Sequence, residues 1–480
     1  MRISIWVKRR QYQKGDALER PNIVFFFTDD QRFNTIHALG NEAIKTPNID
    51  KLVSRGTTFT HAHIPCGTSG AVCMPSRAML HTGRSLFHLD REGQQIPPEH
   101  TTLGQALGAS GYRTFGTGKW HNGRPAFNRS FADGDEIMFN GMTDHWNVPV
   151  YHYDPTGAYD KKVPMCPDPM NSKREVFRAA DHINAGMHSS EMVCSSGIDF
   201  IRQQDNTQPF FAYIAFLAPH DPRVMPEKFK KMYDPKTVVL PPNFMGGHPF
   251  DNGALHIRDE ELAGFPRSPE ETREHIADYY AMITHLDHEL GRVVDALKEK
   301  GMLDNTIIVF AGDNGLALGQ HGLFGKQSCY EHSVRVPLIF AGPGIPEGRQ
   351  TDAYAYLFDI FPTLCSLTGT AVPASVEGKD LAACMRNENT KNRDTLYFAY
   401  ADCQRAVKDR RYKLIEYAVD GRERQTQLFD LLNDPWETAN LAGNPDYAVK
   451  LAELRQELLR LRDEWDDIKH PLGAAFWSRY

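Results

Sequence analysis

Three short apolar runs in this chain are each followed by polar residues, and this pattern restricts the fold more than any other feature. The runs are residues 21–28, 209–217 and 306–311, and the polar residues after them are Asp29 and Asp30, His220, and Asp313 and Asn314. Runs this short and this apolar are typical of strands buried on both faces of a parallel sheet. Ligand sites in such sheets lie beyond the carboxyl ends of the strands, so these polar side chains are candidates for one shared site.

Segments with helical periodicity alternate with the apolar runs. Helices are predicted over residues 46–56, 104–111, 189–204, 271–300, 357–367 and 447–466, and further strands over residues 112–116, 338–341, 396–400, 405–407 and 412–417. Residues 122–173 are rich in Gly, Pro, Asn and Asp, which predicts a long loop region. Alternating strands and helices followed by a run of strands indicate an α/β domain over residues 20–375 and a smaller α+β subdomain over residues 376–480.

Composition excludes several classes of protein. The formal net charge is −7 without a long basic run, so nucleic acid is not an expected partner. The eight cysteines form no C-x-x-C pair, and no apolar run approaches the ~20 residues of a membrane span. The first twenty residues are basic and polar with no apolar core, so a secretory signal is not predicted. We expect a cytoplasmic protein, or a periplasmic or secreted one if the true start is missing.

The stretch from Cys66 to Arg84 carries the sharpest local signal. It reads CGTSGAVCMPSRAMLHTGR, with turn residues up to Ala71 and helix formers from Pro75 onward. Cys73 is therefore predicted at a helix N-terminus, where unpaired amides and the helix dipole favour an anion. Arg77 follows one turn later and adds a fixed positive charge. The alternative is a buried structural cysteine, which is the commoner role of a lone Cys.

Three further basic residues are candidates for the same site. Lys119 and His121 follow the strand predicted at residues 112–116, and alternation places them on one side of an extended segment. Lys326 lies in the Gly-rich segment after Asn314. The segment before Cys73 is also expected to be a strand. Five strand ends then present groups able to surround one anion. Each residue alone is more often a surface group or a satisfied core residue.

These motifs together resemble the formylglycine-dependent sulfatases. The segment CMPSRAMLHTGR is similar to the family signature C-x-P-S-R followed by L-T-G-R, with His81 where the family usually has Leu. Residues 428–441 resemble the C-terminal ELYDL-x-x-DPxExxNLA segment, so the resemblance covers nearly the whole chain. It implies an alkaline-phosphatase-like fold, with a large mixed sheet between helices. It also implies a sulfuric ester hydrolase whose Cys73 is oxidised to Cα-formylglycine by a maturation enzyme.

The resemblance assigns a role to each candidate. It implies one metal ion, and the residues that match the family's ligands are Asp29, Asp30, Asp313, Asn314 and the modified Cys73. Oxygen ligands of this kind suit calcium over zinc. Arg77 matches the residue that holds the formylglycine hydrate, Lys119 and Lys326 match residues that contact the sulfate, His121 matches a base, and His220 matches the group that protonates the leaving alkoxide. The implied reaction passes through a sulfo-enzyme intermediate.

Two alternatives remain open from the sequence. A phosphonate or phosphate monoester hydrolase of the same fold commonly has His where this chain has Asn314. A non-catalytic glycan-binding relative should have lost Cys73 or the lysines, and none is lost. The segment GQHGLFGKQSCYEHSVRVPL resembles the bacterial polysaccharide and glycosaminoglycan sulfatases, so a sulfated carbohydrate is the expected substrate. Loop residues polar enough to contact it are Arg124, His145, His152, Arg223 and His248.

Overall fold

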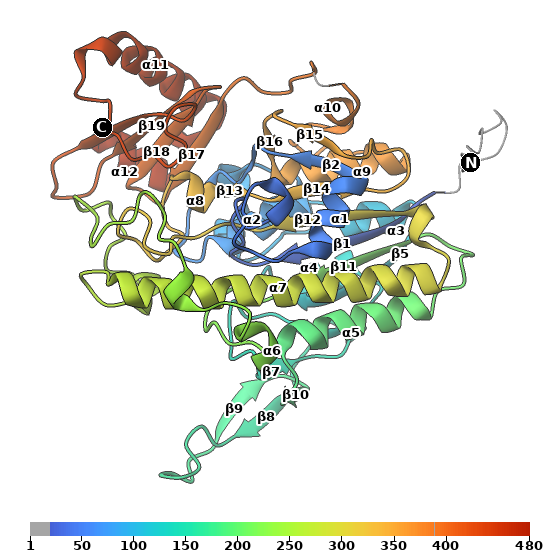
Figure 1. Ribbon diagram of the computed structural model, residues 1–480. Coiled ribbons are helices and arrows are strands. Elements are labelled where there is room, and N and C mark those ends of the chain that lie inside the picture. The colour runs from blue at the N-terminus through green and yellow to red at the C-terminus, as the bar shows by residue number, and fades with distance from the viewer. Residues whose placement is uncertain (1–19, 388) are drawn as a thin grey trace, which may run out of the picture.

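The computed structural model describes residues 20–387 and 389–480 (Figure 1). Residues 1–19, on which the prediction of no secretory signal rests, lie outside that range. None of the helices in the described part of the chain is both long enough and apolar enough to cross a membrane.

An eight-stranded mixed sheet forms the centre of the protein. Its order is β15 (Arg349–Thr351), β2 (Gly56–Phe59), β14 (Leu338–Ala341), β12 (Thr306–Gly312), β1 (Asn22–Thr28), β11 (Phe210–Ala215), β5 (Arg113–Lys119) and β6 (Asp133–Met138). The five strands from β12 to β6 are parallel, whereas β14 is antiparallel to both of its neighbours. The three apolar runs are the adjacent strands β12, β1 and β11, so the predicted buried parallel core is confirmed.

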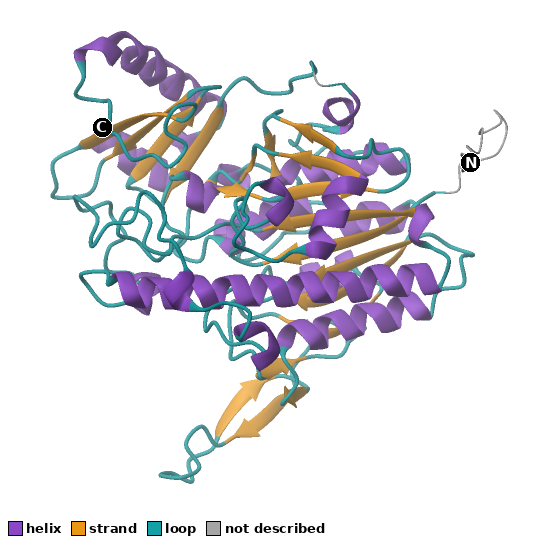
Figure 2. Ribbon diagram, viewed as in Figure 1, coloured by secondary structure: helices purple, strands orange, loops and turns teal. Residues whose placement is uncertain are grey.

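Helices cover both faces of this sheet (Figures 1 and 2). Alternate residues of β1 belong to two separate apolar clusters, with Phe25 and Phe27 in one and Val24 and Phe26 in the other. The cluster of Val24 and Phe26 contains side chains of α1 (Pro47–Arg55), α5 (Ser189–Arg202), α6 (Glu227–Lys230) and α7 (Pro269–Glu299). The opposite cluster contains side chains of α2 (Cys73–Thr82), α3 (Leu103–Ala109), α4 (Arg124–Ser130) and α9 (Ile360–Thr368).

A smaller five-stranded sheet follows near the C-terminus. Its order is β20 (Gln425–Asp430), β19 (Tyr412–Tyr417), β18 (Gln404–Lys408), β17 (Leu396–Tyr400) and β4 (Cys66–Gly67). Helices α11 (Ala448–Glu464) and α12 (Pro471–Arg479) complete this region. The short strand β4 comes from the first part of the chain and pairs in parallel with β17. The predicted smaller sheet with a terminal helix is confirmed, whereas the boundary at residue 375 stays a prediction.

The prediction of a loop over residues 122–173 was wrong in part. This segment contains α4, β6, β7 (Asn147–Val150) and β8 (Lys162–Met165). Strand β8 pairs with β9 (Val176–Ala179) in a hairpin that projects from the body of the protein (Figure 1), and β7 pairs with β10 (His182–Ala185). Four-residue strands that contain Pro149 or Pro164 give too little alternation for sequence analysis to detect. The remaining short elements are β3 (Ala62–His63), β13 (Arg335–Val336), β16 (Ala355–Tyr356), α8 (Glu331–Val334) and α10 (Ala382–Arg386).

Candidate active site

The register of the central strands brings the two acidic pairs to one level. Thr28 at the end of β1 lies beside Gly312 at the end of β12. The next residues, Asp29 and Asp313, therefore leave the sheet side by side. The Asp30 amide donates a hydrogen bond to Asp313 Oδ1 at 3.0 Å, which links the segment after β1 to the segment after β12.

Two strands on the other side of β1 supply the basic groups. In the parallel pair of β11 with β5, Ala215 lies beside Gly118, so Lys119 ends β5 at the same edge of the sheet. The Lys119 ammonium forms an ion pair with Asp29, and both side chains are fully buried. Strand ends alone thus bring together carboxylates and an ammonium from distant parts of the chain.

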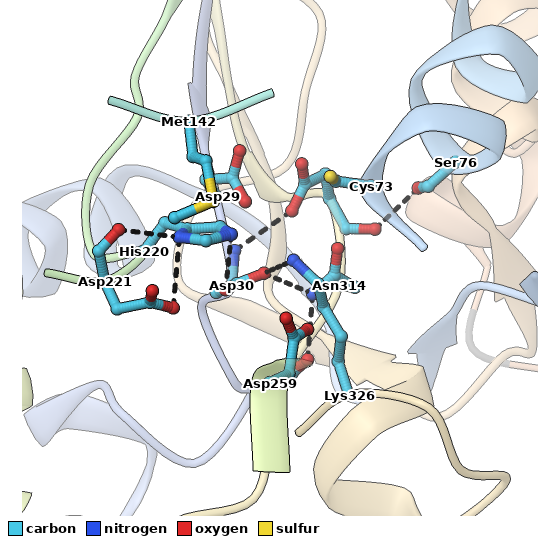
Figure 3. Close-up of polar contacts among 12 residues, drawn as sticks. Asp29, Asp30, Cys73, Ser76, Met142, His220, Asp221, Asp259, Asn314 and Lys326 are labelled. Atoms are coloured by element: carbon cyan, nitrogen blue, oxygen red, sulfur yellow. Dashed lines mark hydrogen bonds and ion pairs between the residues drawn. The ribbon is translucent and has the colours of Figure 1, made fainter. Parts of the chain in front are cut away.

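Cys73 begins α2 and faces this edge (Figure 3). Its Sγ lies 3.6 Å from Lys119 Nζ and 3.5 Å from His121 Nδ1. Cys73, Asp29 and Asp313 could also hold one metal ion, because ligand atoms of all three lie within 4.8 Å of one another. The predicted convergence of Lys119 and His121 on one point is present. Simple strand alternation does not produce it, because His121 has a left-handed φ of 74°.

Arg77 lies one turn after Cys73 and is fully buried. Its guanidinium donates to Asp313 Oδ2 at 2.8 Å, to Asp29 Oδ2 at 3.1 Å and to the Lys119 carbonyl at 2.8 Å. Arg77 therefore holds the ends of three strands together. Burial favours loss of its proton, but the carboxylate of Asp313 outweighs it and keeps the pKa of Arg77 above its usual value.

Asn314 and Lys326 both bind Asp30. The Lys326 ammonium lies 2.7 Å from Asp30 Oδ1 and the Asn314 amide nitrogen lies 2.6 Å from the same oxygen. All three side chains are buried (Figure 3). Burial alone would lower the pKa of Lys326, but Asp30 outweighs that effect and raises it well above its usual value.

The crowded carboxylates suit a hard cation. Burial raises the pKa of Asp30 to about 7, and burial together with the charge of Asp29 raises the pKa of Asp313 to about 6. Burial also acts to raise the pKa of Asp29, but Lys119 and Arg77 outweigh it and hold that pKa well below its usual range. Asp29 Oδ1 and Asn314 Oδ1 are buried without a hydrogen-bond partner in the described structure. Four oxygen-bearing side chains, two of which have an unused acceptor, fit calcium, which binds through oxygen ligands.

His220 lies five residues beyond β11 and faces the same group of carboxylates. Its Nε2 is 3.7 Å from Asp30 Oδ2, and its Nδ1 is 2.9 Å from the Asp221 carbonyl oxygen. Burial, with the charge of Lys326, lowers the pKa of His220 to about 4, and the Asp221 carboxylate opposes this shift. Every residue that the sequence placed in the catalytic and metal site therefore lies in one cluster, in which all but the partly buried His121 are buried.

His145 holds the His220 segment in place. It is 1% exposed, its Nε2 lies 3.0 Å from the His220 carbonyl oxygen, and its Nδ1 bonds Ser189 Oγ at 2.7 Å. The sequence analysis placed His145 among residues able to contact a substrate, but its ring nitrogens are used within the protein. No sequence pattern indicates this contact, because it joins residues 75 positions apart.

The other loop residues proposed as substrate contacts differ in their surroundings. Arg124 bonds the Tyr151 hydroxyl, exposed His152 pairs with Asp135, and His248 bonds the Tyr330 hydroxyl. Arg223 is 8% exposed, and its Nε and Nη2 have no partner in the described part of the chain.

Three residues that the sequence analysis missed lie around the catalytic cluster. Figure 3 shows Met142, Asp221 and Asp259 grouped about His220 and Lys326. Asp221 had a detectable signal, because it directly follows His220 at a strand end. Met142 and Asp259 lie in segments without any motif.

Comparison with known proteins agrees with this geometry. Residues 21–370 match the family model described as Sulfatase, and residues 319–464 match the model described as N-sulphoglucosamine sulphohydrolase, C-terminal. An arylsulfatase of Clostridium perfringens is 29% identical over 475 residues, which cover 92% of this chain and 94% of that protein. An N-acetylglucosamine-6-O-sulfatase of Bacteroides thetaiotaomicron is 25% identical, over 94% and 88% of the two chains. A structure solved with D-glucosamine-2-N,6-O-disulfate superposes with a TM-score of 0.74 at 22% identity, over 94% and 99% of the chains.

The fold has the alkaline-phosphatase-like architecture, which the similar solved structure shares. Within this architecture the chain belongs to the sulfatase family, whose members are sulfuric ester hydrolases. The resemblance stated from the sequence is therefore confirmed, as are the predicted fold class and enzyme class.

Proposed function

We propose that this protein hydrolyses a sulfate ester on a saccharide, using Cα-formylglycine formed from Cys73 and one calcium ion. Asp29, Asp30, Asp313 and Asn314 would hold the ion. The observation that carries the proposal is the position of Cys73, whose Sγ lies within 3.6 Å of both Lys119 Nζ and His121 Nδ1. A side chain placed against two basic groups and a metal-binding cluster is suited to attack an anionic ester.

The thiol itself is poorly suited to that attack. Burial raises the pKa of Cys73, and the charges of Lys119 and Lys326 do not reverse the shift. Because the thiolate is the reactive form of cysteine, an unmodified Cys73 is a weak nucleophile here. The hydrate of formylglycine supplies one hydroxyl for attack on sulfur and a second for later release of sulfate. A maturation enzyme that performs the oxidation is the corresponding protein partner.

Calcium, the two lysines and His121 have separate roles in the proposed reaction. A calcium ion held by Asp29, Asp30, Asp313 and Asn314 would supply positive charge to polarise the sulfate ester. Lys119 and Lys326 present buried ammonium groups at the same edge, where they can bind the other sulfate oxygens. Burial, with the charge of Lys119, holds the pKa of His121 well below its usual value, so its ring is neutral and can accept a proton from the group at residue 73.

His220 faces the site from the next strand and is placed to protonate the leaving oxygen. An incoming sulfate ester adds negative charge near the ring, and this charge opposes the lowering of the His220 pKa by Lys326. Arg77 acts indirectly, because its hydrogen bonds to Asp29 and Asp313 fix the cluster on which the other groups depend.

A sulfated saccharide is proposed as the substrate class because of the relatives. One is named an N-acetylglucosamine-6-O-sulfatase, one similar structure contains a disulfated glucosamine, and the C-terminal family model carries the name of an N-sulphoglucosamine sulphohydrolase. Glucosamine sulfates are therefore the first compounds to assay, beside other sulfated saccharides and an aryl sulfate.

The proposal is tested on protein produced together with a formylglycine-generating enzyme. Mass spectrometry of the peptide that contains Cys73 should show the aldehyde or its hydrate, and sulfate release should scale with the modified fraction. Cys73→Ala is expected to abolish turnover while leaving the melting temperature close to that of the parent. Full activity in a preparation with only unmodified cysteine would overturn the proposal.

A further inference from the structure

Two adjoining cavities lie beside the catalytic centre and are not explained by it. Their volumes are about 180 Å³ and 550 Å³, and both are lined by Arg32, Asn34 and Trp436. They lie between the loop that follows β1 and the segment that follows β20. The larger volume is within the range typical of ligand pockets. We call the two cavities together the Arg32 groove.

Arg32 is buried and has no anionic partner among residues 20–387 and 389–480. Its side chain is 3% exposed, and neither Nε nor Nη1 has a hydrogen-bond acceptor in the described structure. Its guanidinium lies 5.3 Å from the centre of the Tyr279 ring, a contact that leaves the donors free. A buried guanidinium without hydrogen bonds is costly, so its position at a cavity wall indicates an acceptor from outside the chain.

The charges around the smaller cavity also favour an anion. Glu331 and Glu437 line it, but both are engaged by lysines behind the wall. Lys408 lies 2.7 Å from Glu331, and Lys413 lies 3.1 Å from Glu331 and 3.2 Å from Glu437. With those two acids neutralised, the charge of Arg32 stays uncompensated in the groove.

One neighbour adds positive charge to the wall, and a second adds an unpaired ring nitrogen. Arg335 lines the smaller cavity, donates to the Thr60 carbonyl oxygen through Nε, at 2.7 Å, and Nη2, and places its Nη1 4.0 Å from Glu331 Oε2. His332 Nδ1 is also buried without a partner in the described chain, but burial holds the pKa of His332 well below its usual value, so the ring is neutral and adds no charge. A planar guanidinium with free donors matches the oxygens of a sulfate group.

The larger cavity offers the surface that a sugar ring requires. Tyr233, Tyr280 and Trp436 line it, and each has a flat apolar face with a polar edge. Trp436 borders both cavities, so an aromatic ring lies next to the free guanidinium. The combination suits a ring that carries an anionic substituent.

We infer that the Arg32 groove is a non-catalytic subsite for a sulfate group borne on a saccharide, with Arg32 as its anion-binding residue. The choice of a saccharide rests on the proposed function. The subsite adjoins the catalytic centre through Tyr279, whose hydroxyl accepts from the Arg32 amide at 3.0 Å and donates to the Asp30 carbonyl at 2.5 Å. The chain therefore binds two sulfate groups in different places, and only the one at Cys73 is hydrolysed.

The test is calorimetric binding to the full chain carrying Cys73→Ala. The ligands are a heparin-derived tetrasaccharide, the same tetrasaccharide after chemical desulfation, and sodium sulfate. Arg32→Gln should weaken binding of the sulfated tetrasaccharide at least about tenfold, because charge-assisted hydrogen bonds are lost. Arg32→Lys, which keeps the positive charge, should retain part of the affinity for the sulfated tetrasaccharide. Trp436→Ala should weaken binding of the same ligand, whereas Leu432→Ala, a matched change on the same segment at a 71% exposed position, should not.

The outcomes separate the competing explanations. Unchanged binding of the tetrasaccharide in both Arg32→Gln and Trp436→Ala would show that water alone solvates the guanidinium, and would overturn the inference. If Arg32→Gln weakens the binding of sodium sulfate but leaves the binding of the tetrasaccharide unchanged, the assignment to a saccharide is overturned. If Arg32→Gln fails to fold, Arg32→Lys and Trp436→Ala carry the test. If the protein that carries formylglycine at residue 73 hydrolyses no sulfate ester while the Cys73→Ala chain shows Arg32-dependent tetrasaccharide binding, the proposed function is refuted and the subsite stands.

Discussion

Replacing His81 by leucine should stabilise the protein at acidic pH. His81 lies on α2, is 1% exposed, and has no hydrogen-bond partner at either ring nitrogen in the described structure. A buried polar group without a partner costs about 1–3 kcal/mol, and leucine removes that cost. The ring also contacts Trp120 and Tyr213, with centroids 4.3 and 4.8 Å away. Losing these contacts costs about 0.5–1.5 kcal/mol each, so near neutral pH the two effects nearly cancel.

The effect of acidic pH on the free energy of unfolding is not offset in this way. Burial, with the charge of Arg77, lowers the pKa of His81 from 6.5 to about 3. Below pH 6.5 the unfolded chain binds a proton that the folded chain does not, so the free energy of unfolding falls by about 1.4 kcal/mol per pH unit. At pH 5 the penalty is about 2 kcal/mol, or roughly 2 °C in Tm for a chain of this length.

The assay is the Tm of the parent, His81→Leu and His81→Asn at pH 8 and at pH 5. Asparagine keeps a polar group in the same place but does not titrate. The Tm of each variant, measured relative to the parent, should therefore be roughly 2 °C higher at pH 5 than at pH 8. Only the leucine variant should also gain stability from the removal of the polar group. A difference between His81→Leu and the parent that is the same at both pH values would refute the reasoning.

Three further predictions follow from the site and its surroundings. His220→Ala should lose about 10²-fold or more on a sulfated sugar and much less on an activated aryl sulfate, because only the sugar alkoxide needs a proton to leave; equal kcat/KM losses on both would show the role to be misassigned. A chelator should lower both activity and Tm, since the buried carboxylates at the strand ends then repel one another, and added calcium should restore both; zinc as the only stoichiometric metal in active enzyme would contradict the oxygen-ligand argument. Burial acts to raise the pKa of Glu377, but hydrogen bonds from His88 and the Ser85 amide lower it to about 2, so its contribution to stability is complete above pH 4.5 and is lost as the pH falls toward 2. Glu377→Gln should therefore have a lower Tm than the parent at pH 6, and this gap should shrink to less than half at pH 3 and nearly vanish below pH 2; a gap that is as large at pH 3 as at pH 6 would count against this ion pair.

The central sheet and the composition of the site follow from local pattern. β1, β11 and β12 are apolar throughout and end abruptly, so their burial and the exit of Asp29 and Asp313 at one edge need no knowledge of distant contacts. The Cys73 helix follows from its own residues in the same way. These features are local, and local features are what a sequence encodes most directly.

The features that sequence could not supply depend on contacts between distant segments. The role of His145 exists only because a loop after β6 reaches the His220 carbonyl. The unpaired donors of Arg32 likewise result from packing against residues 279 and 436, which no periodicity links to residue 32. Short strands such as β7 and β8 form because a partner strand is present, and their own propensity is weak.

The pairing of β4 with β17 joins the segment before Cys73 to a strand that is synthesised much later. Cys73 is 2% exposed in the folded protein, so the modification proposed for it must occur before the chain closes. β4 precedes Cys73 by a few residues, and its partner at Tyr400 is made about 330 residues later. At roughly 5–20 residues per second, the ribosome reaches that partner about 15–65 s after β4. The strand β4 therefore lacks its partner for up to about a minute, which is time for a modifying enzyme to act on the nearby Cys73 in the growing chain.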